Sequence, residues 1–312
     1  MIKLIIIILF IILYVRIKIF IKIRNKTSVC LCTIGKQENL YVKEFVDHYR
    51  KKGLDKIFIY DNNDINGEKF DMVIKDDIDS GFVDIVEIRG IVAPQIKAME
   101  DCRKKNYKKF DWIIFYDMDE YIFLRNFQNI KQFLNQNFFK KCQRIQLNWM
   151  FHTDNNLIYY DNRTLAERFP VIQKKWINKT IGGVEGIKSI LRGNVNTIIK
   201  NPHYLNPELI SCDGFGKLKE VQGIETNESD HYFNYIDHYW GKSTEEFTNK
   251  LLKGSVAVGY NNTNHTMFRI KIYFGLCDLT MDKINYIENR TKLNLSIYKS
   301  ILLNNTNNNR SY

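Results

Sequence analysis

The sequence lacks the glycine-rich signatures of two large classes of nucleotide-binding protein. No Gly-x-Gly-x-x-Gly follows the first predicted strand, and no Gly-x-x-x-x-Gly-Lys-Ser/Thr occurs anywhere in the chain. These loops hold phosphates with backbone N–H groups in Rossmann and P-loop proteins. Their absence excludes both modes of binding, so a phosphate group must be held in another way.

Proline and linker-like sequence are also scarce. The 312 residues include four prolines, and no Gly/Ser-rich stretch, charge block or internal repeat divides them. With 45% hydrophobic residues, a chain of this length can bury a large core. We predict one main domain at 27–260, a separate segment before it at 1–24, and a helical extension at 261–312 that ends in an Asn-rich tail.

The six cysteines lack the paired spacing of a zinc site. Cys30 and Cys32 lie in one predicted buried strand, where we expect them to be small core residues. The cysteine pattern leaves open whether the protein resides in a reducing or an oxidising compartment.

Acidic residues are absent from the first 26 positions, which carry six of the basic residues. The net charge of +11 therefore falls to +5 in the rest of the chain, where 40 basic residues oppose 35 acidic ones. Because no basic stripe with interleaved aromatic residues is present, we expect no nucleic-acid partner. A sugar-nucleotide pocket or an anionic membrane surface accounts for the remaining surplus.

An uninterrupted apolar run at residues 4–15 predicts a membrane anchor. The run is shorter than the roughly 20 residues that span a bilayer, but snorkelling by Arg16 and Lys18 extends it to Ile21. We predict a membrane protein with a single-pass N-terminal anchor. The side of the membrane stays open, because the basic residues after the run favour a cytoplasmic body, whereas many Asn-x-Ser/Thr triplets would suit a secretory lumen.

Residues 28–117 alternate between predicted strands and predicted helices. Buried strands are expected at 28–33, 56–60, 83–88 and 112–117, and helices at 38–52, 68–80 and 94–107. This order is typical of an α/β fold with a doubly wound, mostly parallel sheet flanked by helices. Such sheets bind ligands beyond the carboxyl ends of their strands.

Two aspartates follow the fourth predicted strand, at the edge where a ligand is expected. In an extended chain Asp117 and Asp119 emerge on the same side, and two carboxylates can bind a hard divalent cation. A cation at this position suits a diphosphate group. The competing interpretation is that both residues are ordinary turn formers after a strand.

Six blocks of sequence occur in an order typical of one enzyme group. They are Thr33-Ile-Gly-Lys-Gln-Glu-Asn39; Phe45-Val-Asp-His-Tyr-Arg-Lys-Lys-Gly53; Ile57-Phe-Ile-Tyr-Asp-Asn-Asn63; Gln95 with Trp112 to Tyr121; Asn148-Trp-Met-Phe151 with Asp161 to Phe169, Lys188-Ser-Ile190 and Pro202-His-Tyr204; and Asp237-His-Tyr-Trp-Gly-Lys-Ser243 with Glu246 to Gly254. Over about residues 28–257 the chain resembles GT-A glycosyltransferases, and more narrowly glycosyltransferase family 92 and its relatives in the family 2-like group. His152-Thr153 depart from the pattern, since relatives often have glycine there.

The resemblance implies a metal-dependent glycosyltransferase. It would transfer a hexose, with galactose as one candidate, from a nucleotide sugar, with a UDP-sugar favoured, to a hydroxyl of a glycan or glycoconjugate, with inversion. The cofactor would be Mn²⁺ or Mg²⁺, which neutralises charge on the departing diphosphate. Asp119 would coordinate the ion, and Asp117 would share it or hold the ribose. His238 would be a third ligand, or else a hydrogen-bonded core residue.

The same resemblance implies further donor-binding residues. They are Thr33, Glu38, Asp61 and Gln95. Lys242 would pair with the diphosphate, or else be a solvated neighbour of the helix that Ser243 and Glu246 begin with a capping box.

Inversion requires a general base that takes the proton of the acceptor hydroxyl. Asp154 and Asp213 are the two candidates, and each has the alternative role of a turn residue. Trp149 and Phe151 would stack on a sugar face or belong to the core. Two other functions stay open: a metal-dependent phosphoryl-transfer or hydrolytic enzyme that uses the same acids, and a catalytically silent carbohydrate-binding protein of the same fold.

Overall fold

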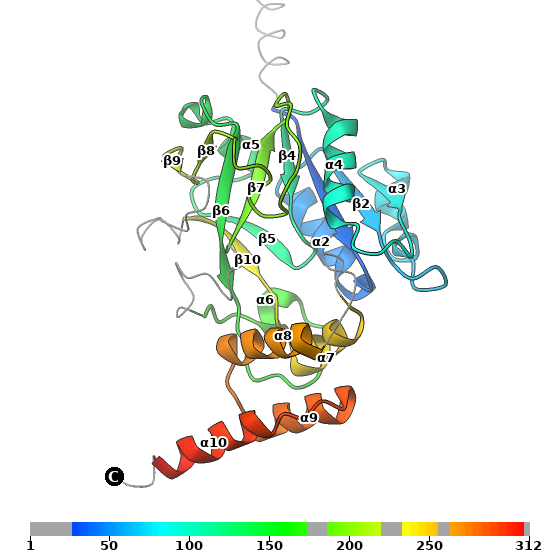
Figure 1. Cartoon of the computed structure of the whole chain (residues 1–312). Helices are drawn as coiled ribbons and strands as arrows, with labels where there is room; N and C mark the ends of the chain where they lie inside the picture. The colour runs from blue at the N-terminus through cyan, green and yellow to red at the C-terminus, as the bar shows by residue number, and fades with distance from the viewer. Residues whose placement is uncertain (1–26, 174–185, 220–232, 255–262, 309–312) are drawn as a thin grey trace, which may run out of the picture.

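The computed structural model describes residues 27–173, 186–219, 233–254 and 263–308 (Figure 1). Within these ranges a ten-stranded sheet has the order β3-β2-β1-β4-β7-β6-β10-β5, with β8 paired to β6 and β9 paired to β8. The strands are β1 Val29–Gly35, β2 Lys56–Asp61, β3 Val83–Glu87, β4 Trp112–Phe115, β5 Glu120–Leu124, β6 Arg144–Phe151, β7 Ile187–Arg192, β8 Ser211–Cys212, β9 Leu218–Lys219 and β10 Asn234–His238.

Helices join these strands and cover them. The α-helices are α2 Asn39–Lys51, α3 Lys75–Asp79, α4 Gln95–Asn106, α5 Ile130–Leu134, α6 Leu165–Arg168, α7 Thr244–Leu252, α8 Thr263–Leu276, α9 Met281–Thr291 and α10 Ser296–Asn308, with 3₁₀ turns η1 Phe70–Met72 and η2 Asn137–Phe139.

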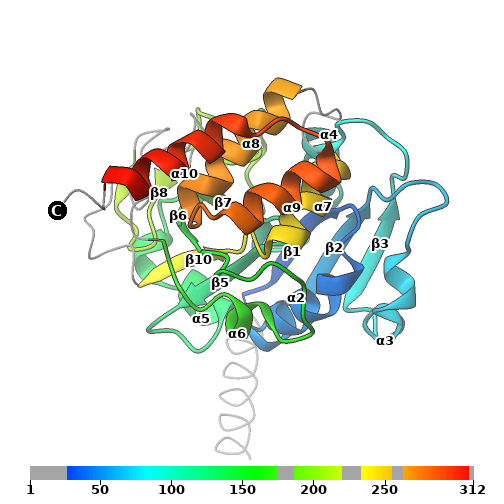
Figure 2. The same ribbon diagram turned by 90° about the horizontal axis from the view of Figure 1, so that it is seen from below.

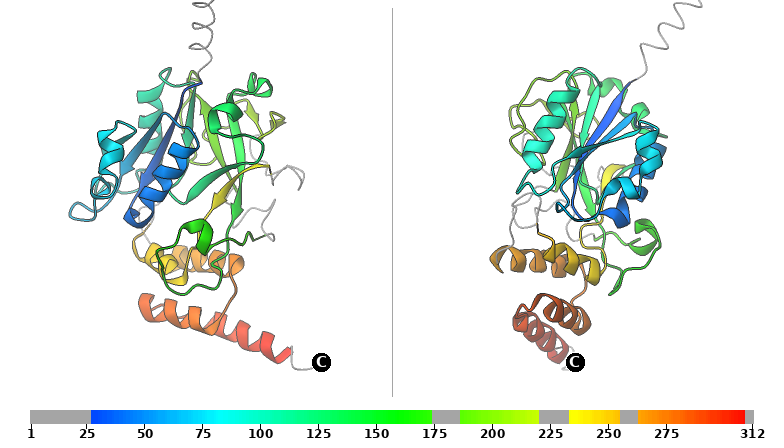
Figure 3. Two further views of the ribbon diagram at one scale, coloured as in Figure 1. Left: turned by 180° about the vertical axis from the view of Figure 1, so that it is seen from behind. Right: turned by 90° about the vertical axis from the view of Figure 1, so that its right-hand side faces the viewer.

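The first four strands form the parallel, doubly wound half of the sheet that the sequence predicts. β1 pairs in parallel with β2 and β4, and β2 pairs in parallel with β3. Alternate residues of β1 face opposite sides: Leu31 lies in the buried cluster that includes Phe45 of α2, whereas Cys30 lies in the cluster that includes Met99 of α4. Helices α2 and α4 therefore cover opposite faces of the strands (Figure 3), and the predicted α/β class is confirmed.

The helix predicted at 68–80 is shorter than expected. The chain forms the turn η1 at Phe70–Met72 and then the helix α3 at Lys75–Asp79. Asp76 and Asp77 lie in the first turn of α3, where a carboxylate is favoured by the partial positive charge of a helix N-terminus. This preference explains why a new helix begins at Lys75, and why no longer helix starts earlier and continues through Asp76.

Beyond β4 the sheet becomes mixed. β7 is antiparallel to both β4 and β6, β10 is parallel to β6, and β5 is antiparallel to β10. The last of these pairings sets His238 of β10 opposite Glu120 of β5. Two residues far apart in the sequence thereby meet just beyond the end of β4.

Helix α7 begins at the capping box that the sequence predicts. The hydroxyl of Ser243 accepts a hydrogen bond from the N–H of Glu246 at 3.3 Å, and the Glu246 carboxylate accepts one from the N–H of Ser243 at 3.1 Å. The same carboxylate pairs with the buried guanidinium of Arg168 at 2.7 Å and accepts a hydrogen bond from Tyr41 at 2.6 Å. These contacts fix the start of a helix whose later residues line a cavity.

Three C-terminal helices, α8, α9 and α10, cover one end of the sheet (Figures 1 and 2). Tyr273 of α8 is buried and stacks on Phe247 of α7, with ring centroids 4.1 Å apart. Helices α9 and α10 form a further layer beyond α8. The described part of the extension predicted at 261–312 is therefore helical, while its boundary with the main domain stays a prediction.

The predicted membrane location needs correction. Across the described ranges, no helix combines the length and the apolar character that crossing a membrane requires. The expected anchor at 1–24 lies outside the described residues. The prediction of a single-pass N-terminal anchor therefore has no support from the structure, and we do not retain it.

Two disulfide bonds link the sheet to its surroundings. Cys32 of β1 is bonded to Cys102 of α4, and Cys142 is bonded to Cys212 of β8. Cys32 lies in the core as predicted, and α4 packs on the face of β1 to which Cys32 points, so that Cys102 lies beside it and forms the disulfide bond. Cys30 is a buried core residue, as predicted, and its thiol is free.

Removal of the second disulfide tests this part of the fold. The double variant Cys142→Ser/Cys212→Ser should lose about 2–5 kcal/mol of the free energy of unfolding, because the bond closes a long loop in the unfolded chain. Urea denaturation measures the loss. Cys277→Ala, which removes a buried free thiol, should cost only about 1 kcal/mol. Peptide mapping of the non-reduced protein that finds Cys142 unlinked would contradict the assignment.

Candidate active site

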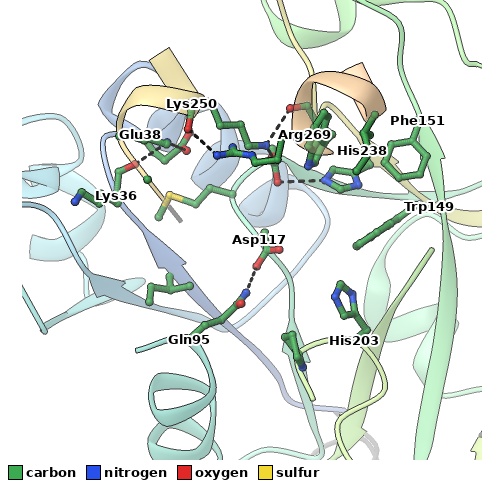
Figure 4. A pocket seen from close by; sticks show the side chains of 18 of the residues that line it. Lys36, Glu38, Gln95, Asp117, Trp149, Phe151, His203, His238, Lys250 and Arg269 are labelled. Carbon is green, nitrogen blue, oxygen red and sulfur yellow. Dashed lines mark hydrogen bonds and ion pairs between the residues drawn. The ribbon is translucent and has the colours of Figure 1, made fainter. Parts of the chain in front are cut away.

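A cavity of about 320 Å³ lies beyond the carboxyl ends of the strands. Residues that follow β1 and β4 line one side, together with the ends of β6 and β10, and α7 and α8 close the other side (Figure 4). Asp117 and Asp119 both line this cavity. The sequence therefore placed these acids correctly, at the ligand-binding edge of an α/β sheet.

The chain turns sharply after β4 and does not continue as a strand. β4 ends at Phe115, and the N–H of Glu120 donates to the carbonyl of Asp117 at 3.1 Å. In this turn successive side chains no longer point to opposite sides, as they would in an extended chain. The side chains of Asp119 and Glu120 therefore both lie near His238. One ligand atom from each of these three residues lies within 4.8 Å of the others.

Asp119 is an ionised carboxylate held between two basic groups. Its Oδ2 lies 2.8 Å from Nζ of Lys250 in α7, and its Oδ1 lies 3.5 Å from Nε2 of His238. Burial alone would raise the pKa of Asp119, but the Lys250 ammonium and the His238 ring outweigh burial and hold this pKa well below its usual range.

Glu120 is completely buried beside Asp119. Its Oε2 accepts a hydrogen bond from the N–H of Asp117 at 3.0 Å. Its Oε1 has no hydrogen-bond partner among the described residues, and the Lys188 ammonium lies 3.8 Å away. Burial, which the Lys188 charge only partly offsets, raises the pKa of Glu120 well above its usual value.

His238 completes the cluster as a neutral imidazole. Burial lowers its pKa in spite of the opposing charge of Asp119, and the neutral ring is the form that binds metals. Its Nδ1 is buried and has no hydrogen-bond partner within the described ranges. The rings of Trp149 and Phe151 flank it, with centroids 4.4 Å and 5.0 Å from that of His238.

Asp117 takes a separate position from this cluster. Its Oδ2 lies 2.8 Å from Nζ of Lys188, and its Oδ1 accepts a hydrogen bond from the side chain of Gln95 at 3.1 Å (Figure 4). Both carboxylate oxygens therefore have partners outside the group of Asp119, Glu120 and His238. The position favours the second role suggested for Asp117, a contact to the ribose, over shared coordination of an ion.

Glu38 lines the same cavity as a carboxylate between two lysines. It pairs with Lys253, and its Oε2 lies 3.4 Å from Nζ of Lys242. Burial would raise the pKa of Glu38, but these two lysines lower it overall. Lys242 itself faces a neighbouring hollow, where its ammonium lies 3.3 Å from the centroid of the Tyr41 ring. It therefore does not line the main cavity.

Thr33 and Asp61 also lie outside the lining of the main cavity. The Thr33 hydroxyl is buried at a small hollow between β1 and α4, without a hydrogen-bond partner among the described residues. Asp61 is buried at the end of β2 and pairs with Arg89, and burial raises its pKa. The donor-binding roles of Thr33, Asp61 and Lys242 stay predictions.

The two predicted bases are both held in structural contacts away from the cavity. Asp154 is buried, accepts a hydrogen bond from the Tyr273 hydroxyl at 2.8 Å and pairs with Nζ of Lys283 at 2.5 Å. Asp213 accepts hydrogen bonds from the N–H groups of Phe215 and Lys217 at 2.9 Å and 3.0 Å. Their positions give no support to a catalytic role, which stays a prediction.

Several site residues were missed in the sequence, among them Glu120, Lys188, Lys250 and Arg269. Glu120 is adjacent to Asp119, and only the turn after β4 brings their carboxylates together. Lys250 and Arg269 come from two different helices, α7 and α8, which meet at the cavity. A signal was present for Arg269, because it shares an i, i+3, i+4 spacing with His265 and Phe268 on one helix face.

A family model described as glycosyltransferase family 92 matches residues 25–264. The chain belongs to glycosyltransferase family 92. The resemblance noted in the sequence is therefore confirmed. The family 92 match ends just inside α8, so nearly all of the three C-terminal helices lie beyond it.

Two curated family 92 relatives are from plants. A family 92 protein of Ricinus communis is 31% identical over 108 residues, which make up 33% of this chain and 18% of that protein. Another, from Oryza sativa subsp. japonica, is 25% identical over 242 residues, or 75% of this chain and 36% of that protein. The chain thus matches well under half the length of either relative.

Solved structures show only distant likeness to this family 92 chain. Residues 1–349 of S. aureus TarS, in complex with UDP-GlcNAc, are 11% identical with a TM-score of 0.37, over 85% of this chain and 79% of that chain. The mannosyltransferase PcManGT from Pyrobaculum calidifontis, in complex with GDP-Man and Mn²⁺, is 8% identical with a TM-score of 0.32, over 39% and 35%.

Two acids of this family 92 site, Asp117 and Glu120, should depend on Lys188, whose side chain is 1% exposed. Lys188→Met removes the cation beside Asp117 and Glu120, so the free energy of unfolding should fall by about 3–5 kcal/mol. Urea denaturation measures the change. The control Lys200→Met removes an exposed lysine that pairs with an exposed glutamate, Glu208. It should lower the free energy of unfolding by less than about 1 kcal/mol. Equal losses in both variants would disprove the role of Lys188.

Proposed function

We propose that the chain is a metal-dependent hexosyltransferase. It transfers a hexose, with galactose as one candidate, from a UDP-sugar to a hydroxyl of a glycan or glycoconjugate, with inversion. Membership of family 92 supports glycosyl transfer. The observation that carries the proposal is the buried cluster of Asp119, Glu120 and His238 beside the cavity. The cavity volume of about 320 Å³ falls in the range of roughly 300–1,000 Å³ that is usual for small-molecule sites.

The cluster fits a divalent cation. Glu120 Oε1 is a buried polar atom with no hydrogen-bond partner within the described part of the chain, and such an atom is costly unless a ligand satisfies it. Nε2 of His238 faces Oδ1 of Asp119 at 3.5 Å. Two carboxylates and a neutral imidazole suit Mn²⁺, whereas Mg²⁺ prefers oxygen alone. Asp119, Glu120 and His238 would therefore hold the ion, which supplies a positive charge to neutralise the leaving diphosphate.

Basic side chains above the cluster would hold the diphosphate. Lys250 and Lys253 of the α7 region line the cavity and are paired with Asp119 and Glu38. A cation on Asp119 would compete with the Lys250 ammonium, which then becomes available to phosphate oxygens. Asp117, fixed by Lys188 and Gln95, would accept hydrogen bonds from the ribose.

The aromatic wall of the cavity suits a sugar ring. Trp149, Phe151 and His203 line it, and the rings of Trp149 and His203 meet edge to face at 5.2 Å. The indole N–H of Trp149 is buried without a hydrogen-bond partner among the described residues, so a sugar hydroxyl would satisfy it. Inversion also requires a base. We leave Asp154 and Asp213 out of the mechanism because neither lines the cavity.

Removal of a proposed metal ligand tests this function. In an assay of nucleoside-diphosphate release from a panel of nucleotide sugars with Mn²⁺ and a glycan acceptor, Asp119→Asn and Glu120→Gln should each lower kcat/KM at least about 100-fold. Asp79→Asn changes an exposed carboxylate on α3 and should leave the rate unchanged. Chelation with EDTA should abolish turnover, and Mn²⁺ should restore it.

Each competing function predicts a different result in the same assay. Release of inorganic phosphate without an acceptor would indicate a phosphoryl-transfer or hydrolytic enzyme. Tight nucleotide binding with no transfer from any donor would indicate a silent binding protein. Full activity of Asp119→Asn, or of the wild type in EDTA, would disprove the metal-dependent mechanism.

A further inference from the structure

One wall of the cavity comes from the first C-terminal helix. His265, Phe268, Arg269 and Ile272 of α8 line the cavity, and their spacing of i, i+3, i+4 and i+7 places them on one face of the helix. The family 92 match ends at residue 264, before any of them. This wall of the site therefore belongs to a part of the chain outside the family match.

Arg269 is the basic residue on that face, and it lies in an unusual environment. The side chain is 7% exposed, and a guanidinium nitrogen donates to the carbonyl of Lys250 at 3.1 Å (Figure 4). Among the described residues, no carboxylate oxygen lies within 4.0 Å of a guanidinium nitrogen of Arg269, which is the distance limit for an ion pair. Burial lowers the pKa of Arg269 to about 10, but the group stays charged at neutral pH.

The three lysines of the cavity differ from Arg269 because each has a carboxylate partner. Lys36 pairs with Asp64 at 2.9 Å, Lys250 pairs with Asp119 at 2.8 Å, and Lys253 pairs with Glu38. A buried charge without a counter-ion is unfavourable by several kcal/mol. In a cavity, an anionic ligand removes this penalty when it binds.

We propose that Arg269 binds the diphosphate of the donor, so that α8 completes the donor site. This inference rests on the proposed function, since it takes the anion to be a nucleoside diphosphate. The planar guanidinium can donate two parallel hydrogen bonds to phosphate oxygens. Its bond to the carbonyl of Lys250 joins α8 to α7, so the two cations lie over Asp119, where the proposed metal ion would bind.

Binding of nucleotides of different charge tests the proposal. Isothermal titration calorimetry measures the dissociation constants of UDP, UMP and inorganic pyrophosphate, each with Mn²⁺. These constants are compared for wild type, Arg269→Gln and Arg269→Lys. Arg269→Gln should weaken binding of UDP and pyrophosphate about 10- to 100-fold, because it removes charged hydrogen bonds to phosphate. UMP should change by less than about threefold, and Arg269→Lys, which keeps the charge without the planar fork, should be intermediate.

A matched control lies on the same helix. Lys271→Gln removes a positive charge from the exposed side of α8 and should leave UDP binding unchanged. The unfolding temperature of Arg269→Gln without ligand should equal or exceed that of wild type, because an unpaired buried charge is removed. A purely structural arginine would instead lower that temperature in the variant.

The possible outcomes separate this inference from the proposed function. If Arg269→Gln binds UDP as tightly as wild type does, the role of Arg269 is overturned and the donor assignment stands. Equal weakening of UDP and UMP would also overturn it, since the contact would then not be to the second phosphate. Wild-type protein that binds none of the common nucleoside diphosphates would overturn both proposals.

Discussion

The burial of several carboxylates just beyond β4 is the constraint on which the rest of the site depends. Glu120 is completely buried and Asp119 is largely buried, and a buried negative charge persists only beside a positive one. Lys250 of α7 meets this need for Asp119, and Lys188 of β7 meets it for Asp117. Lys188 only partly offsets the burial of Glu120, whose pKa stays raised. Elements from the second half of the chain are thus held against the end of a strand from the first half.

The change from a parallel to a mixed sheet is what brings these groups together. A purely parallel sheet would carry each later strand away from β4 with its own crossover helix. Here β7 returns antiparallel beside β4, and β10 lies between β6 and β5, so that Lys188 and His238 both reach the turn at 116–119. Glu120 Oε1, which stays without a partner among the described residues, and His238 Nε2, which faces Asp119, are the atoms that a bound cation would contact.

Local patterns in the sequence predicted the first half of the fold well, because strands buried on both faces and amphipathic helices have distinct periodicities. They predicted the site less completely. We expected Asp117 and Asp119 to point to the same side because we assumed an extended chain. The strand in fact ends at Phe115, and the turn that follows brings Asp119 close to Glu120. The partners Lys188, Lys250 and Arg269 depend on long-range packing, which no local spacing specifies. The one long-range expectation that agrees with the structure, His238 beside Asp119, came from family resemblance and not from periodicity.

The central claim is that Asp119, Glu120 and His238 form a metal site at the mouth of a nucleotide cavity. Anomalous X-ray diffraction from crystals grown with Mn²⁺ and UDP tests it most directly. We expect one manganese peak between these three side chains, in contact with the diphosphate, and a Lys250 side chain that has moved from Asp119 toward phosphate. Bound UDP without a manganese peak at this cluster, or with manganese held by other residues, would contradict it.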